Sequence, residues 1–156
     1  MRVEDENDPD PWIDWTTALD RRETVPVLND AHAALLGEVW AGSARGRNDV
    51  VMLTLGTGVG GAVLAGGRLL RGAIGRAGHI GHLSLDPEGT PSITGMPGAL
   101  ETLVGECTLA ARSGGRFTST ADLVAAHRAG DAHATRVWRE SVRALAFGLG
   151  SCINLF

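Results

Sequence analysis

The chain has 156 residues, a length that suits one domain or one lobe of a larger protein, and 44% of them are hydrophobic. Its 14 basic residues are all arginine, so a Walker A motif, a Schiff-base lysine and a protein-kinase strand lysine are excluded. The net charge of −4, without a basic stripe or an apolar run of membrane-span length, argues against a nucleic-acid partner and a membrane span.

The first 24 residues are expected to form an acidic lead-in that ends in a short helix. Residues 1–14 contain six of the 18 acidic residues, whereas a secretory signal begins with a basic region. Apolar residues at helical spacing predict the helix over 12–22. The chain contains only two cysteines, Cys107 and Cys152, which do not suggest a disulfide framework, so a cytoplasmic protein is expected.

The following residues alternate between strand-like and helix-like patterns, and the last third is helical. Strands are expected at 25–28, 50–55, 62–64, 68–70 and 82–86, a loop at 87–98, and helices at 31–44, 99–112, 121–128 and from 132 onward. Asn29 or Asp30 would cap the first of these helices and Asp131 the last. The apolar stripe expected on the last helix consists of Ala134, Val137, Trp138, Leu145, Leu149 and Ile153.

A glycine-rich turn is the first candidate site. Gly56, Gly58 and Gly61 satisfy G-x-G-x-x-G, but a dinucleotide-binding fold needs a helix at the third glycine, and a strand-like run follows here. Two interpretations stay open: a plain β-turn, or a hairpin that binds a phosphate through backbone N–H groups and the Thr57 hydroxyl. In the second, glycine is needed because a Cβ would block the approach of the anion.

Polar residues elsewhere also have two interpretations each. Asn29 and Asp30 are a helix N-cap, or acidic and amide groups at the carboxyl end of a strand where α/β sheets bind ligands. Glu101 is a favourable first-turn acid, or an acceptor for a ligand hydroxyl. His79-Ile80-Gly81-His82 spells the HIGH box of class I aminoacyl-tRNA synthetases, whose partner motif requires the lysine that this chain lacks. As a metal pair, His79 and His82 would need further ligands.

Four motifs occur in order along residues 25–156. Residues 25–34 are similar to the motif PV…NDANAA, 51–61 to LTLGTGVGGG, 75–82 to GxAGExGH, and 95–101 to CGxxGCLE. Each motif alone is weak, but the four in this order resemble the ROK family of sugar kinases and sugar-responsive repressors, and within it the glucokinases.

The resemblance implies an α/β fold of the actin-like, ribonuclease-H-like type, with two lobes and the active site between them. Residues 1–24 would be a lead-in, and 25–156 would form most of the second lobe, with a mixed sheet followed by a helical half. The family's DxGGT phosphate motif and its adenosine-side glycine motif do not occur in the sequence. The chain is therefore expected to be truncated at both ends and inactive in isolation.

The resemblance also implies an ATP-dependent kinase that phosphorylates glucose or a related hexose, with Asp30 as the general base. The expected sugar-binding residues are Asn29, Asp30, His79, His82 and Glu101, and the expected phosphate-binding residues are Gly56, Thr57 and Gly58. ATP and Mg²⁺ would be the cofactors, because the metal offsets phosphate charge. The sugar and ATP would be the partners, and the full-length protein would be a homo-oligomer, a dimer.

Two departures from the family pattern modify these expectations. The three cysteines that hold a structural zinc in many members correspond to Ser92, Thr94 and Ala99, so only His82 remains of that ligand set and no zinc is expected. The glutamate of ExGH is His79, which can donate as well as accept a hydrogen bond, so the sugar preference is expected to differ. Two alternatives stay open: a sugar-sensing repressor of the same family, and a degenerate homologue without catalytic activity.

Overall fold

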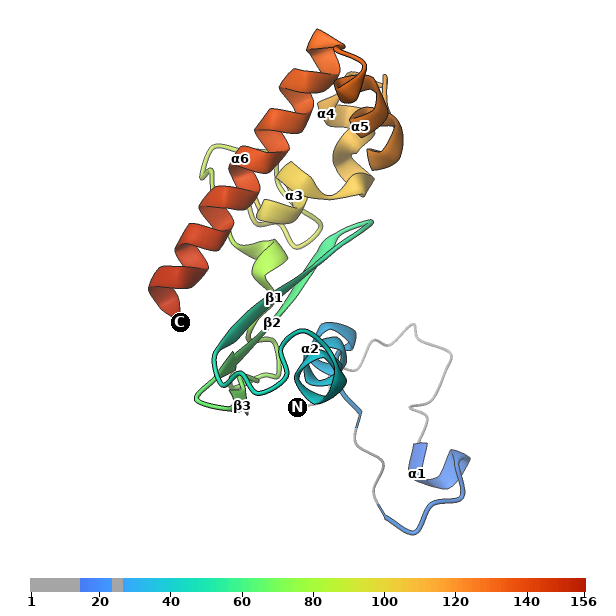
Figure 1. The fold of residues 1–156 in the computed structure, drawn as a ribbon, viewed down its shortest axis with the longest axis vertical. Helices are drawn as coiled ribbons and strands as arrows, with labels where there is room; N and C mark the ends of the chain where they lie inside the picture. The colour runs from blue at the N-terminus through green and yellow to red at the C-terminus, as the bar shows by residue number, and fades with distance from the viewer. Residues whose placement is uncertain (1–14, 24–26) are drawn as a thin grey trace.

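The computed structural model describes residues 15–23 and 27–156, and these form a small sheet joined to a helical half (Figure 1). The elements are α1 (Trp15–Ala18), α2 (Asp30–Ala41), β1 (Val50–Leu55), β2 (Val59–Ala65), β3 (Arg68–Leu69), η1 (Ile80–His82), α3 (Leu100–Val104), η2 (Glu106–Thr108), α4 (Leu109–Arg112), α5 (Thr120–Arg128) and α6 (Ala132–Leu155). Among these described elements, no helix is both long and apolar enough to cross a membrane.

The sheet of the described residues is antiparallel throughout, in the order β1-β2-β3, so the expectation of a mixed sheet is corrected. The physical reason is the length of the connections: tight turns join the three strands, and a parallel pair needs a crossover of a dozen or more residues. β1 pairs with β2 from Val50↔Leu64 to Leu55↔Val59. The second strand therefore begins at Val59, three residues before the expected start, and it includes Gly60 and Gly61.

Helix α2 covers one face of this sheet (Figure 1), where Ala31 and Leu35 pack with Ala62 and Leu64. Its N-cap is Asn29, one of the two residues expected to cap this helix. The Oδ1 of Asn29 accepts hydrogen bonds from the amides of Ala31 and His32 in the first turn.

Two expectations at the N-terminal end need correction or fall outside the described residues. The run 25–28 is not a strand where it is described, because Val27 and Leu28 pair with no strand and the chain turns directly into α2. Residues 25 and 26 lie outside the described part. Of the helix expected over 12–22, the structure describes α1 only, and residues 12–14 lie outside it.

The prediction of a strand over residues 82–86 is wrong. The 3₁₀ turn η1 occupies its start, and only an isolated bridge between Ser84 and Ala99 follows. Close packing explains the difference, since a Cβ at Gly81 would collide with the carbonyl oxygen of Val59, so the segment lies against β2 rather than pairing beside it. The loop expected at 87–98 is present and is closed by a second bridge between Pro91 and Pro97.

The helix expected over 99–112 is interrupted at Gly105, giving α3, η2 and α4. A Cβ at Gly105 would lie 2.8 Å from Glu101 O and 3.0 Å from Thr57 O, so this residue lies directly against the β1–β2 turn. The interruption lets the chain pass close to that turn before it continues into α4. The expected α5 and α6 are present, capped by Ser119 and Asp131.

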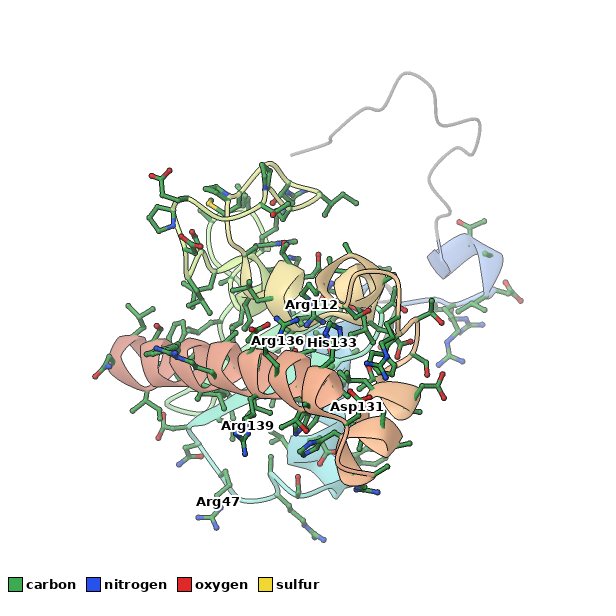
Figure 2. The ribbon with its side chains drawn as sticks, turned by 90° about the horizontal axis from the view of Figure 1, so that it is seen from above. Arg47, Arg112, Asp131, His133, Arg136 and Arg139 are labelled. Atoms are coloured by element: carbon green, nitrogen blue, oxygen red, sulfur yellow. The ribbon has the colours of Figure 1, made fainter. Side chains whose placement is uncertain are left out.

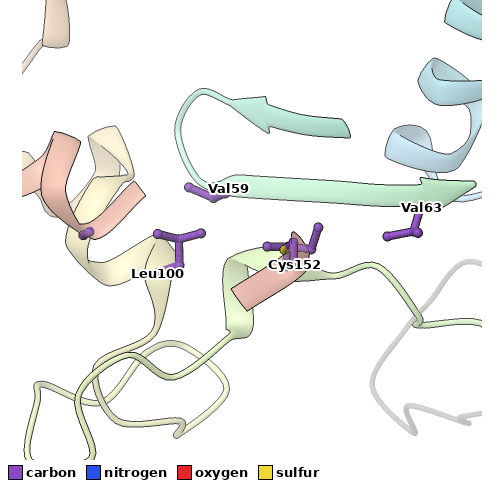
Figure 3. Packing of buried hydrophobic residues seen from close by; sticks show 6 residues of the cluster. Val59, Val63, Leu100 and Cys152 are labelled. Atoms are coloured by element: carbon purple, nitrogen blue, oxygen red, sulfur yellow. The ribbon is translucent and has the colours of Figure 1, made fainter. Parts of the chain in front are cut away.

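Helix α6 runs along the helical half, and its buried face differs from the expected stripe. The buried residues are Ala134, Val137, Ser141, Ala144, Gly148 and Cys152. Leu149 and Ile153 are 40% and 79% exposed, because small residues rather than large ones allow α6 to approach α3. Leu100 is fully buried there, in a core with Val59, Val63 and Cys152 that joins the sheet to the helices (Figure 3).

Candidate active site

A polar cleft of about 400 Å³ opens beside the β1–β2 turn, and most of the expected site residues line it. The residues lining this cleft are Asp30, Thr54, Leu55, Gly56, Thr57, Gly58, Val59, Gly60, His79, His82 and Glu101. They come from the start of α2, the β1–β2 hairpin, the η1 segment and the first turn of α3, which lie far apart in the sequence. Asn29 is the one expected site residue that does not line the cleft.

The turn at 56–58 is held from behind by the segment that follows α3. The amides of Glu106 and Cys107 donate to the carbonyl oxygens of Gly56 and Thr57, at 3.1 and 2.9 Å. Within the described part of the chain, the amides of Thr57 and Gly58 have no acceptor, so both are available to a ligand oxygen. Outward N–H groups on a fixed turn are an anion-binding arrangement.

Glu101 contacts this turn directly. Its Oε2 accepts a hydrogen bond of 2.9 Å from the amide of Val59, and a Cβ at Gly58 would collide with the same oxygen. Of the glycines in the turn, Gly58 leaves the room that the Glu101 carboxylate occupies, whereas nothing lies within 4 Å of a Cβ built at Gly56. The protein itself therefore occupies one of the two acceptor oxygens of Glu101, Oε2, and leaves Oε1 for a ligand.

Asp30 is the first residue of α2, and its side chain is exposed to the cleft. Its Oδ1 accepts 2.8 Å from the amide of Ala31, which fixes the carboxylate at the helix N-terminus. The helix N-terminus therefore presents a hydrogen-bond acceptor to the cleft. The Asn29 side chain is used as the N-cap instead, through its Oδ1.

Three histidines lie together, and two of them, His79 and His82, line the cleft. The ring centroid of His79 is 6.4 Å from that of His32 and 6.2 Å from that of His82. Partial burial lowers the pKa of His79 below its ordinary value of 6.5, and the positive charges of His82, His32 and Arg76 lower it further, against the opposing effect of Asp30. His79 is therefore neutral at pH 7, able to donate from one ring nitrogen and accept at the other.

His32 was not among the expected site residues. It is 3% exposed, and its Nε2 lies 3.0 Å from the carbonyl oxygen of Ala77, which ties α2 to the segment that presents His79. The signal that could have revealed it is the motif itself, because His32 stands where NDANAA has its second asparagine.

The zinc ligand set that the resemblance would supply does not fit these residues. Ser92 Oγ and Thr94 Oγ1 lie 3.0 Å apart and hydrogen-bond each other, and Ala99 offers no donor atom. His82 Nδ1 is buried without a partner within the described residues. Across the same residues, no group of three or more histidine, cysteine or carboxylate side chains is arranged to hold a metal.

A second, more apolar pocket of about 260 Å³ shares the turn with the cleft. It is lined by Leu55, Gly56, Gly58 and Val59, which also line the cleft, and by Val104, Glu106, Thr120, Trp138, Val142 and Leu145 from the helical half. The glycine turn thus separates a polar chamber from an apolar one.

Comparisons with known proteins agree with this arrangement. The family model described as the ROK family matches residues 13–156. A glucokinase of Halalkalibacterium halodurans is 46% identical over 88 residues, 54% of this chain and 27% of that protein. An N-acetylmannosamine kinase of Citrobacter koseri is 40% identical over 122 residues, 77% of this chain and 42% of that protein.

Solved structures show the same relationship. The ROK hexokinase from Thermus thermophilus superposes with a TM-score of 0.82 at 37% identity, covering 90% of this chain and 49% of that one. A ROK family glucokinase from Streptomyces griseus, solved with glucose and AMPPNP, gives 0.71 at 30% identity, covering 90% and 51%. The expected α/β, actin-like fold is confirmed by this likeness to ROK sugar kinases.

The chain spans about half the length of these solved structures and less than half of the two curated relatives. Another similar structure, a ROK family transcriptional regulator, has a TM-score of 0.74 at 28% identity over 90% of this chain and 38% of that one. Kinases and regulators thus share this architecture. The match of the family model over nearly all of the sequence shows that the chain belongs to the ROK family.

Proposed function

We propose that the full protein is an ATP-dependent sugar kinase that transfers the γ-phosphate of ATP to a hydroxyl of glucose or a related hexose. The observation that supports it best is the placement of the Asp30 carboxylate in the same cleft as the glycine turn with its free amides. A phosphoryl acceptor and donor would meet between these two groups. Residues 25–156 would form the second lobe of this enzyme, which would work in the cytoplasm, where ATP is made.

In this mechanism Asp30 would accept the proton of the sugar hydroxyl while the hydroxyl oxygen attacks the γ-phosphorus of ATP. The bond from that phosphorus to the β,γ-bridging oxygen would break, and ADP would leave with its electron pair. A carboxylate is a weak base, with an ordinary pKa of about 3.9. In a loose phosphoryl-transfer transition state the positioning of the hydroxyl matters more than the basicity of the acceptor. Fixation of the Asp30 carboxylate on the amide of Ala31 provides that positioning.

The remaining cleft residues would bind the two substrates. Oε1 of Glu101 and the rings of His79 and His82 would hydrogen-bond sugar hydroxyls, and Asn29 would act through the N-cap that orients α2. The amides of Thr57 and Gly58 would bind nucleotide phosphates, and the apolar pocket beside Trp138 would suit the base. Mg²⁺ would arrive with ATP, since phosphate oxygens supply many of its ligands.

An N-acyl hexosamine is the second candidate substrate, because a neutral imidazole at position 79 can donate to an acyl oxygen, which a carboxylate cannot. The N-acetylmannosamine kinase relatives also align with more of this chain than the glucokinases do. Phosphorylation rates with glucose and N-acetylmannosamine side by side would separate the two substrates.

The Asp30→Asn substitution in the full-length protein tests the proposal. We expect kcat to fall by about 10²–10⁴-fold, while the dissociation constant of the sugar stays within a few-fold of wild type. Glu88→Gln, an exposed change in the loop away from the cleft, is the control and should leave both constants unchanged. A kcat near wild type in Asp30→Asn contradicts the mechanism. Sugar binding by the wild-type protein without any ATP consumption would favour the regulator instead.

A further inference from the structure

Arg112 is a half-buried arginine outside the cleft, at the end of α4 (Figure 2). Its Nε donates to Thr108 Oγ1 and one Nη to the carbonyl oxygen of Gly105, both at 3.1 Å. The other Nη donates to Ser141 Oγ at 2.7 Å. Within the described residues, no carboxylate lies within ion-pair distance of this guanidinium.

A cation that is partly removed from water without a carboxylate partner is costly, so the location of Arg112 needs a reason. Burial lowers the pKa of Arg112, while the nearby Cys107 and Glu140 oppose that effect, and an arginine keeps its charge at any working pH. A neutral glutamine or methionine would pack here at lower desolvation cost. What the guanidinium adds is a rigid fork that reaches two acceptors in the segment 105–108 and a third on α6.

The first two acceptors, Thr108 Oγ1 and the carbonyl oxygen of Gly105, belong to the strap at residues 105–108, defined here as the segment between α3 and α4. Thr108 Oγ1 also donates to the carbonyl oxygens of Thr102 and Gly105, so the strap is cross-linked to α3. At its other side the strap donates the amides of Glu106 and Cys107 to the turn. Arg112 is thus two hydrogen bonds away from the carbonyl oxygens of Gly56 and Thr57.

The third contact fixes the strap to α6. Ser141 is 7% exposed on the buried face of that helix, and its hydroxyl donates back to the carbonyl oxygen of Val137. A continuous path of hydrogen bonds therefore runs from the core of α6 through Arg112 and the strap to the turn. A hairpin tip without such backing would be mobile, because its own ladder ends at Leu55↔Val59.

We propose that Arg112 is a positioning residue for nucleotide binding, which fixes the strap so that the turn keeps the Thr57 and Gly58 amides aimed at the phosphates. The inference rests on the proposed kinase function, since it assigns nucleotide phosphates to that turn. It separates the two substrates: Arg112 acts on the nucleotide side, whereas the sugar side depends on Asp30, His79 and Glu101.

The test uses Arg112→Lys in the full-length protein, which keeps the charge but cannot form the three-way fork. We expect the dissociation constant of ADP to rise about tenfold or more, because the loss of charge-assisted hydrogen bonds to the strap would loosen the turn that it holds. The dissociation constant of the sugar should stay within twofold. Hydrogen exchange at the amides of Glu106 and Cys107 should accelerate, while exchange within the β1–β2 ladder stays unchanged.

Two further variants keep the test decisive. Ser141→Ala removes the hydrogen bond between Arg112 and α6, together with the bond from Ser141 to Val137 O within that helix, and should raise the ADP dissociation constant by about threefold. Arg116→Lys, at an exposed ion pair with Asp131, is the matched control and should change neither constant. Unchanged ADP binding in Arg112→Lys and Ser141→Ala overturns the inference and leaves the kinase proposal intact. Absence of nucleotide binding by the wild-type protein overturns both.

Discussion

The Glu101 carboxylate accepts a hydrogen bond of 2.9 Å from the backbone amide of Val59, 42 residues earlier in the chain. This contact joins the first turn of α3 to the first residue of β2, next to the glycine turn. Because the acceptor is a charged side chain and the donor a fixed amide, the bond is of the stronger, charge-assisted kind. Glu101 therefore links the proposed sugar side of the cleft with its proposed phosphate side.

Gly58→Ala should break this arrangement. Its Cβ would occupy the place of Glu101 Oε2, so the carboxylate must move and Val59 loses its acceptor. We expect kcat/KM to fall at least about tenfold, and the melting temperature to drop by a few degrees because a charge-assisted bond is lost. Gly37→Ala, in the middle of α2 with nothing within 4 Å of its Cβ, is the matched control and should stabilise the protein slightly. Equal activity of Gly58→Ala and wild type would contradict the role of the contact.

The sequence predicts the hairpin and the caps well because their signals are local. The strand at Val50–Leu55, the N-cap at Asn29 and the cap at Asp131 each depend on a few neighbouring residues. The interruption at Gly105 and the 3₁₀ turn before Ser84 were not predicted. Both result from contact with β1–β2 residues distant in sequence, and periodicity does not report such contacts.

The candidate site follows the same division. The motifs place Asp30, Glu101 and the glycine turn in one cleft, as the structure also does. The motif marks position 32, but it gives no indication that His32 is buried beside His79, or that an arginine in α4 donates to the carbonyl oxygen of Gly105. Patterning of large apolar residues also misplaced the buried face of α6, because the contact with Leu100 selects glycine at position 148. These features depend on packing between elements.

His79 should make the protein less stable in mild acid. Its pKa is lowered in the folded state, so as pH falls through 6.5 the unfolded chain takes up the proton first. The stability that neutral His79 gives the folded protein is fully present above pH 6.5. It is lost as the pH falls further, because the folded protein must then accept a charge near His82, His32 and Arg76. When the pH is lowered from about 8 to about 5.5, we expect the melting temperature of His79→Gln to fall by less than that of wild type. A larger loss in His79→Gln than in wild type would contradict the sign.

The purified protein should contain no stoichiometric zinc. Hydroxyls at Ser92 and Thr94 and a methyl at Ala99 replace soft thiolate ligands, and a single histidine cannot hold the metal. Elemental analysis should therefore give far less than one zinc per chain, and a chelator should not change the melting temperature. One zinc per chain would show this prediction to be wrong.

The converse experiment restores the thiolates. The triple variant Ser92→Cys, Thr94→Cys and Ala99→Cys should take up about one zinc per chain, the number that a single four-ligand site holds. Adding His82→Ala to it should weaken that binding, because Nδ1 of His82, buried without a partner among the described residues, would be the fourth ligand atom. Failure of the triple variant to bind zinc would mean that these positions do not converge as the family motif implies.

The apolar pocket beside the turn should determine how strongly the nucleotide base adds to phosphate binding. Val142 lines this pocket from α6 and is 46% exposed, so a larger side chain fits there without disturbing the core. Val142→Trp should fill much of the 260 Å³ and exclude a base, while the amides at Thr57 and Gly58 stay free for phosphate. We expect the variant to bind ADP about tenfold more weakly and pyrophosphate as well as wild type does.

Ala146→Trp, exposed on the same helix and lining neither chamber, should leave both affinities unchanged. A variant that still prefers ADP to pyrophosphate as strongly as wild type would place the base elsewhere, whereas loss of both affinities would mean that the new indole displaces the turn itself.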